Sequence, residues 1–207
     1  MKKTIEKEAI NDLPAMKFQG DIVIINKKEE MLDALKTLSE EKFIGFDTET
    51  KPSFQKNKSF KVSLLQLATS SKAYLFRLKT LGLPQPLAEI LSNPSIFKIG
   101  LALPQDIKGL QDLTPFTPQS FIDLQTLARE NDIGVLGLRG LCGLFLGKKL
   151  SKKAKLSNWE NKFLSKAQIH YAATDAWVSR EIFFQMEKSE LFDRKHFTSL
   201  AKKEEQR

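Results

Sequence analysis

Phe43-Ile44-Gly45-Phe46-Asp47-Thr48-Glu49 is the segment from which the fold can be predicted outward. Its first four residues are apolar or small, which is typical of a buried strand, and its end is acidic. In a strand, residues i and i+2 point to the same side, so the carboxylates of Asp47 and Glu49 are expected to converge while Thr48 faces away. Such a pair can hold a hard cation such as Mg²⁺. Taken alone, the pair is better explained as a turn with two solvated acids.

The segments on both sides predict an α/β domain. Strands are expected over residues 21–25, 61–69, 73–76 and 96–101, and helices over 28–41, 84–91, 104–113, 121–131, 136–146 and 164–188. The two middle strands are separated only by Ser70-Ser71-Lys72, which predicts a hairpin and therefore a mixed sheet. Helices accumulate late in the chain, so we expect a central mixed β-sheet flanked by α-helices. A polar leader is expected over residues 1–20, one domain over 21–195, and a polar tail over 196–207.

Composition narrows the class of protein. The chain has 207 residues and is 41% hydrophobic, which fits one globular domain. The single cysteine, Cys142, lies in an apolar run, so we expect it in the core and exclude a disulfide framework or a cysteine-rich zinc site. No stretch approaches the ~20 apolar residues of a membrane span, so the cytoplasm is the default compartment. The net charge of +8 favours a polyanionic partner such as nucleic acid, although a solvated lysine-rich surface has the same composition.

Two further acidic patches follow the first. Asp106 lies near the start of the helix predicted after the 96–101 strand, where the helix dipole favours an anion. Tyr171 and Asp175 are four residues apart in a predicted helix and therefore share one face. There the carboxylate can hold a metal while the phenol reaches a water or a phosphate oxygen. Each patch alone is common in helices, so their order along the chain carries the argument.

In that order the patches resemble the motifs of the 3′–5′ exonucleases with four acidic ligands, in the branch with a tyrosine in the third motif (DEDDy). Phe46 to Thr50 resembles the first motif, Ile99 to Asp106 the second, and His170 to Ala176 the third. The resemblance is greatest to the ribonuclease D and Werner syndrome type, covers roughly residues 21–188, and implies a ribonuclease H-like fold. One departure puts substrate positioning in doubt: residues 101–105 lack the asparagine that precedes the aspartate in many members.

The resemblance also implies a mechanism. The chain is expected to release nucleoside 5′-monophosphates from a nucleic-acid 3′ end with two divalent ions, Mg²⁺ or Mn²⁺. Asp47 would bridge both ions, Glu49 and Asp175 would help hold the ion that activates water, Asp106 would serve the second, and Tyr171 would orient the water. Two such ions stabilise the attacking and the departing oxygen, and a shell of carboxylates suits Mg²⁺ or Mn²⁺ better than zinc.

Substrate contacts are expected around this site. The resemblance suggests that a residue near Glu49 and an apolar wedge grip the terminal nucleotide, for which Thr50, Leu65 and Leu103 are candidates, although both leucines are better explained as core. Five lysines before Trp159 form a basic cluster that we expect to contact phosphates, with a solvated loop as the alternative: Lys148, Lys149, Lys152, Lys153 and Lys155. Trp159 is expected to anchor its loop rather than to stack on a base. His170 is expected to be structural.

Two other functions stay open at this point. A noncatalytic nucleic-acid-binding module could share the fold, but such a module has no need to cluster carboxylates that repel one another. A metal-dependent phosphoesterase that acts on small nucleotides is disfavoured mildly by the basic charge of the chain. Polymer and free nucleotide substrates would separate the second from an exonuclease.

Overall fold

The computed structural model describes residues 2–53, 59–151, 153–195 and 197. These residues form a six-stranded sheet, in the order β1-β4-β3-β2-β5-β6. The strands are β1 (Asp21–Ile25), β2 (Phe43–Thr50), β3 (Val62–Ala68), β4 (Lys72–Phe76), β5 (Phe97–Gly100) and β6 (Phe121–Asp123). Pairing is antiparallel for β2 with β3 and β3 with β4, and parallel for β1 with β4, β2 with β5 and β5 with β6. The predicted mixed sheet and its hairpin are thereby confirmed.

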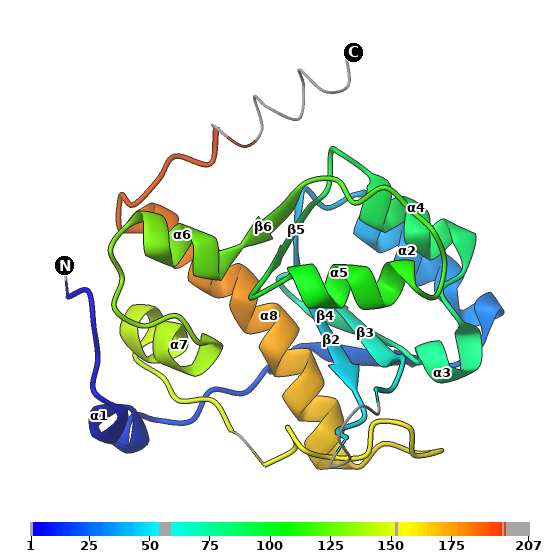
Figure 1. The fold of residues 1–207 in the computed structure, drawn as a ribbon, viewed down its shortest axis with the longest axis horizontal. Helices are drawn as coiled ribbons and strands as arrows, with labels where there is room; N and C mark the ends of the chain where they lie inside the picture. Colours follow the sequence, from blue (N-terminus) through cyan, green and yellow to red (C-terminus); the bar gives the residue numbers. More distant parts are fainter. Residues whose placement is uncertain (1, 54–58, 152, 196, 198–207) are drawn as a thin grey trace.

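Helices cover both faces of the sheet (Figure 1). They are α1 (Lys7–Asp12), α2 (Leu32–Ser39), α3 (Leu78–Leu81), α4 (Gln85–Ser92), α5 (Pro104–Gln111), α6 (Leu124–Glu130), α7 (Leu138–Leu146) and α8 (Lys166–Lys188), with a 3₁₀ turn η1 (Lys28–Met31) before α2. Side chains of α2, α4 and α5 pack in one core cluster, and those of α6, α7 and α8 pack in clusters on the other face. The long helix α8 crosses the sheet and contacts its central strands.

Residues of β2 alternate between the two faces. Ile44 and Phe46 pack in the cluster of α2, α4 and α5, whereas Phe43 packs on the side of α8. A Cβ atom at Gly45 would lie only 1.9 Å from the carbonyl oxygen of Ala176, so α8 rests directly on the backbone of β2. This close approach fixes α8 over the strand whose end is acidic.

One predicted helix begins too early. Residues 121–131 were expected to be helical throughout, but Phe121–Asp123 form the edge strand β6, parallel to β5, and α6 begins only at Leu124. The reason is the capping residue: the side chain of Asp123 accepts a hydrogen bond from the backbone N–H of Gln125 at 2.8 Å, which starts the helix there. A three-residue strand is too short for its periodicity to be read from sequence.

Within the described residues 2–20, two side chains pack against the domain. The helix α1 buries Ile10, and Phe18 is buried beside α8. Cys142 is buried and unpaired by disulfide, as expected for a core cysteine. Leu65, Leu103 and Trp159 are buried as well, which confirms that they belong to the core. Among the described residues, no helix combines the length and the apolar character that a bilayer crossing requires.

Candidate active site

The acidic end of β2 extends beyond one of its two neighbouring strands. Its register with β5 covers Phe43 to Gly45, whereas its register with β3 continues to Thr50 with an irregularity after Glu49. Because side chains alternate, Asp47 and Glu49 share the face of Gly45, on which α8 rests. The two carboxylates therefore lie at the rim of the sheet, under the first half of α8.

Asp106 reaches the same rim from the opposite face. It lies in the first turn of α5, and the hydroxyl of Thr48 donates a hydrogen bond to its carboxylate. Thr48 points away from Asp47 and Glu49, as its position in the strand predicted. This contact between Thr48 and Asp106 joins the second acidic patch to the first.

A fifth carboxylate, absent from our predictions, positions the turn that carries Asp106. Asp123, at the end of β6, accepts hydrogen bonds from the backbone N–H groups of Ala102, at 3.0 Å, and Leu103, at 3.1 Å. Ala102 adopts a left-handed backbone conformation with φ of 57°. The Asp123 contacts thus offset the cost of a conformation that an alanine rarely adopts. Its position as the N-cap of α6 was the sequence signal that could have revealed it.

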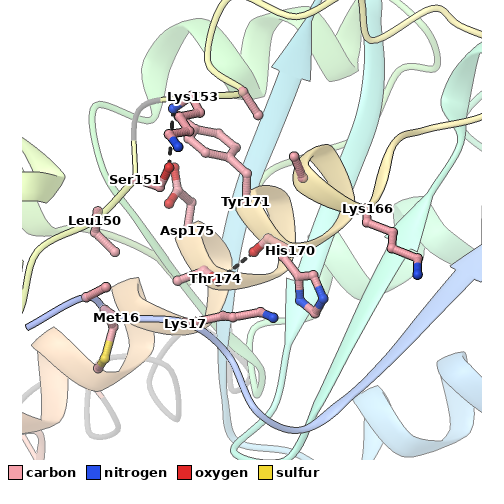
Figure 2. A pocket seen from close by; sticks show the side chains of 13 residues that line it. Met16, Lys17, Leu150, Ser151, Lys153, Lys166, His170, Tyr171, Thr174 and Asp175 are labelled. Atoms are coloured by element: carbon pink, nitrogen blue, oxygen red, sulfur yellow. Dashed lines mark hydrogen bonds between the residues drawn. The ribbon is translucent and has the colours of Figure 1, made fainter.

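The third patch lies on α8. A capping box fixes the start of this helix: Ser165 accepts from the backbone of Gln168 at 3.2 Å, and Gln168 accepts from the backbone of Ser165 at 3.0 Å. One turn later, Tyr171 and Asp175 interact: burial raises the pKa of the Asp175 carboxyl, and the neighbouring Tyr171 hydroxyl lowers it. Figure 2 shows both side chains on the same side of α8, toward the loop that carries Ser151. The predicted i, i+4 arrangement is confirmed.

The electrostatics of the site show that its carboxylates face one another. Burial, followed by repulsion from Asp175 and Asp106, raises the pKa of Asp47 well above its ordinary value. Burial, followed by repulsion from Asp47, Asp175 and Asp106, raises the pKa of Glu49 to about 10. Burial also raises the pKa of Asp175 to about 7 and that of Asp106 above its usual range. The four acids thus lie close enough together for their negative charges to repel one another.

The residues present fit divalent cations. The donor set consists of carboxylate oxygens, which suit hard ions such as Mg²⁺ or Mn²⁺. Among the described residues, no group of three acid, histidine or cysteine side chains already stands at metal-coordinating spacing. A cation would offset the burial of these carboxylates and the repulsion at Asp47 and Glu49, so the cluster is better suited to a cation than to an empty core.

Gln66 adds an observation that the sequence did not reveal. It lies on β3 directly opposite Asp47 and is fully buried. Within the described part of the chain, neither polar atom of its side-chain amide has a hydrogen-bond partner. An unpaired buried amide costs about 1–3 kcal/mol, so its place beside the carboxylates is costly to stability.

The residues predicted to contact nucleic acid lie in different surroundings. Lys155 lies close enough to the carboxylates to lower the pKa values of Glu49 and Asp175. Lys149 donates from Nζ to the carbonyl of Asn11, so it binds the leader. Lys153 lines a cavity beside α8. Thr50 and Lys148 are half-buried, and Lys152 lies outside the described residues.

Two aromatic groups near α8 can be assigned. The fully buried Trp159 lies with its ring centroid 6.0 Å from that of Tyr171, so it supports the tyrosine from the core. His170 does not share the direction of Tyr171 and Asp175, and its ring lies near Lys17 (Figure 2). It is therefore separate from the acidic cluster.

Comparison with known proteins identifies the family. The sequence profile of the 3′–5′ exonuclease family matches residues 22–190, most of the chain. The chain belongs to the 3′–5′ exonuclease family. This membership confirms the resemblance found in its three acidic patches.

Individual members of the 3′–5′ exonuclease family show the extent of the similarity. The chain is 33% identical over 193 residues to the bifunctional 3′–5′ exonuclease/ATP-dependent helicase WRN of Mus musculus, covering 88% of this chain and 14% of that protein. It is 28% identical to ribonuclease D of Gluconacetobacter diazotrophicus, covering 79% of this chain and 42% of that one. Among solved structures, the Nibbler EXO domain of Aedes aegypti superposes with a TM-score of 0.77 at 26% identity, covering 90% of this chain and all of that one. The chain thus spans only part of the length of its curated relatives.

Proposed function

We propose that this chain is a metal-dependent 3′–5′ exonuclease that hydrolyses phosphodiester bonds and releases nucleoside 5′-monophosphates. The observation that supports the proposal is the buried acidic cluster at the end of β2, where burial, followed by repulsion from neighbouring carboxylates that include Asp175 and Asp106, raises the pKa values of Asp47 and Glu49. Protein folds rarely bury like charges without a function for them. The net charge of +8 supports a nucleic-acid substrate.

The carboxylates have distinct places in this proposal. Asp47, Glu49 and Asp175 would hold one divalent ion from the α8 side, and Asp47 with Asp106 would hold a second. The ions, when bound, would supply a lowered pKa for the attacking water and a positive charge for the departing oxygen. Thr48 and Asp123 act from outside this set, because they fix the carboxylate of Asp106 and the turn before it.

Tyr171 is suited to orient a water rather than to remove its proton. Burial, with the charges of Asp175 and Glu49, raises the pKa of the Tyr171 hydroxyl above its ordinary value. The phenol therefore stays protonated at neutral pH and acts through hydrogen bonds. Lys155, whose charge lowers the pKa values of Glu49 and Asp175, would contact a phosphate of the substrate. Thr50, Lys148, Lys149, Lys152 and Lys153 remain proposed contacts of the strand.

Tyr171→Phe is expected to lower kcat by roughly 10²-fold, because a positioned proton-bearing group contributes about that much. The free energy of unfolding should change little, since the ring and its packing against Trp159 are kept. Rate measurements under saturating oligonucleotide, beside thermal unfolding, check both. Tyr74→Phe, the same deletion in the core of β4, is the matched control and should leave kcat unchanged. Equal rates for the two variants would remove Tyr171 from the mechanism.

Analysis of products tests the proposed function. Single-stranded DNA and RNA oligonucleotides, incubated with the protein and Mg²⁺ or Mn²⁺, are expected to yield nucleoside 5′-monophosphates on chromatography. Free nucleotides, which are small phosphate esters, are tested in parallel as the alternative class of substrate. Hydrolysis of those small molecules but not of polymers would favour a phosphoesterase. Binding of the polymer without any release would favour a noncatalytic module.

A further inference from the structure

A cavity of about 590 Å³ is lined by Tyr171 and Asp175 of the candidate site, but not by Asp47, Glu49 or Asp106. Three segments that are far apart in the sequence line it: residues 15–17 of the leader, the loop residues 150–151 and 153–154, and the first turns of α8. Figure 2 shows this arrangement, with the leader passing below α8 and the loop above it. We refer to it as the leader cavity. Its volume lies within the range of small-molecule sites, which is roughly 300–1,000 Å³.

The leader is fixed in place as a wall of this cavity. The backbone N–H of Met16 donates to the carbonyl of Lys149 at 2.8 Å, and that of Lys149 donates to Pro14 at 3.0 Å. The N–H of Phe18 donates to the hydroxyl of Thr174 at 3.1 Å, and its ring lies 5.4 Å from that of Trp177. These contacts connect residues 14–18 both to Lys149, at the start of the lysine cluster, and to the turn of α8 that carries Asp175.

The rim of the leader cavity is basic and its interior is apolar. Lys17, Lys153 and Lys166 line it, one from each segment, and all three are exposed. None of the three forms an ion pair with another described residue, among the pairs within 4.0 Å. Met16 and Leu150 contribute apolar side chains. Free cations around an apolar hollow match a nucleotide, whose base is planar and whose phosphates are anionic.

We propose that the leader cavity binds one nucleotide of the single-stranded substrate, with the base against the apolar interior and the phosphates at Lys17, Lys153 and Lys166. Tyr171 and Asp175 form one wall of the cavity and also belong to the acidic cluster, so a strand in the active site can reach it directly. The leader becomes part of the substrate site in this way. The proposal rests on the exonuclease function proposed above.

Binding without cleavage tests this proposal. The double substitution Lys17→Glu with Lys166→Glu should raise the Kd for a 5′-labelled 12-nucleotide strand, in chelator, by about 10-fold or more. It should also reduce the salt slope by about 1.4, because each single-strand phosphate that the protein no longer neutralises lowers the slope by about 0.7. Ala167→Phe, which fills the cavity without changing charge, should weaken binding as well. Thermal unfolding verifies that each variant folds.

The matched control is Lys28→Glu with Lys36→Glu, an equal charge change in the region of η1 and α2. If the leader variants bind no more weakly than this control, the cavity is not a substrate site. Competition by inorganic polyphosphate as strong as by an oligonucleotide of equal charge would reduce it to a general anion patch. Cleavage by the unmodified protein is scored separately, so a wild type that binds and cleaves keeps the exonuclease function whichever way the cavity test falls.

A second inference comes independently from Gln66. Cross-strand neighbours project to the same face, so the buried amide of Gln66 lies beside the carboxylate of Asp47, under α8. Both amide atoms lack a hydrogen-bond partner among the described residues. We infer that Gln66 is a positioning residue, whose Nε2–H groups donate to Asp47 when cations hold the cluster together. Partners behind metal ligands commonly change metal affinity by 10–100-fold.

Gln66→Leu separates this role from mere packing. Without metal, the variant should be more stable, because an unpaired buried amide is removed at nearly constant volume. Mn²⁺ is expected to raise the unfolding temperature of both proteins. The Mn²⁺ concentration that gives half of the full rise should be about 10-fold or more higher for the variant than for wild type. Gln125→Leu on α6, outside the site, should leave this midpoint unchanged. A Gln66→Leu protein that keeps the wild-type midpoint would show that the amide does not position Asp47.

Discussion

Asp47→Asn is expected to abolish cleavage, by roughly 10³-fold or more, and at the same time to raise the unfolding temperature measured in chelator. The loss of rate follows because Asp47 faces the other acids and would share both ions, each worth several kcal/mol to the transition state. The gain in stability follows because one of four repelling charges is removed. The unfolding temperature should rise by roughly 2–4 °C for each kcal/mol of repulsion that is relieved.

The pH dependence gives the sign of this effect. The pKa values of Asp175 and Glu49, about 7 and about 10 in the folded chain, lie above their ordinary values. The stability that these two carboxyl groups contribute is therefore fully present below about pH 4, and it is lost as the pH rises through their pKa values in the folded chain. Lys98, whose pKa burial lowers to about 7, titrates in the same range in both proteins. The difference in unfolding temperature between Asp47→Asn and wild type should thus grow from about pH 5 to about pH 8. A difference that shrinks would contradict the repulsion.

Gly45→Ala is expected to destabilise the fold by roughly 3 kcal/mol and to lower activity beyond what unfolding explains. The added methyl group would meet the carbonyl oxygen of Ala176 at 1.9 Å, and a backbone atom cannot move aside as a side-chain tip can. α8 must lift from β2, and Asp175, on the same helix, moves with it. Denaturant unfolding and residual cleavage at a temperature where the variant is folded measure the two effects.

Gly137→Ala supplies the comparison for Gly45. A Cβ atom at Gly137 would meet no heavy atom within 4 Å, so the same substitution there should change stability by about 0.5 kcal/mol or less. Similar losses for the two variants would mean that the contact between β2 and α8 does not limit stability. Full activity in folded Gly45→Ala would separate that contact from the site.

Much of the site could be predicted because its signals are local. Alternation placed Asp47 and Glu49 on one face and Thr48 on the other, and helical spacing paired Tyr171 with Asp175. The order of the three patches along the chain then indicated the family. Such features depend only on residues a few positions apart, and the fold preserves them.

The remaining features depend on contacts between distant segments. Asp123 holds the turn before Asp106 from 20 residues away, and its place after a three-residue strand concealed that role. The proposed role of Gln66 depends on the strand register that sets it opposite Asp47. The leader cavity needs Lys17 and Lys166 to meet across about 150 residues of chain. No local pattern encodes these juxtapositions.

Shortening of a 5′-labelled strand, followed in time, tests the proposed activity most directly. With Mg²⁺ or Mn²⁺, wild type is predicted to produce a ladder that recedes one nucleotide at a time from the 3′ end, whereas chelator and the Asp47→Asn variant leave the strand intact. A strand labelled at its 3′ end should lose its label in the first step. Shortening that persists in chelator or in Asp47→Asn, or that starts from the 5′ end, would contradict a metal-dependent 3′–5′ exonuclease built on this carboxylate cluster.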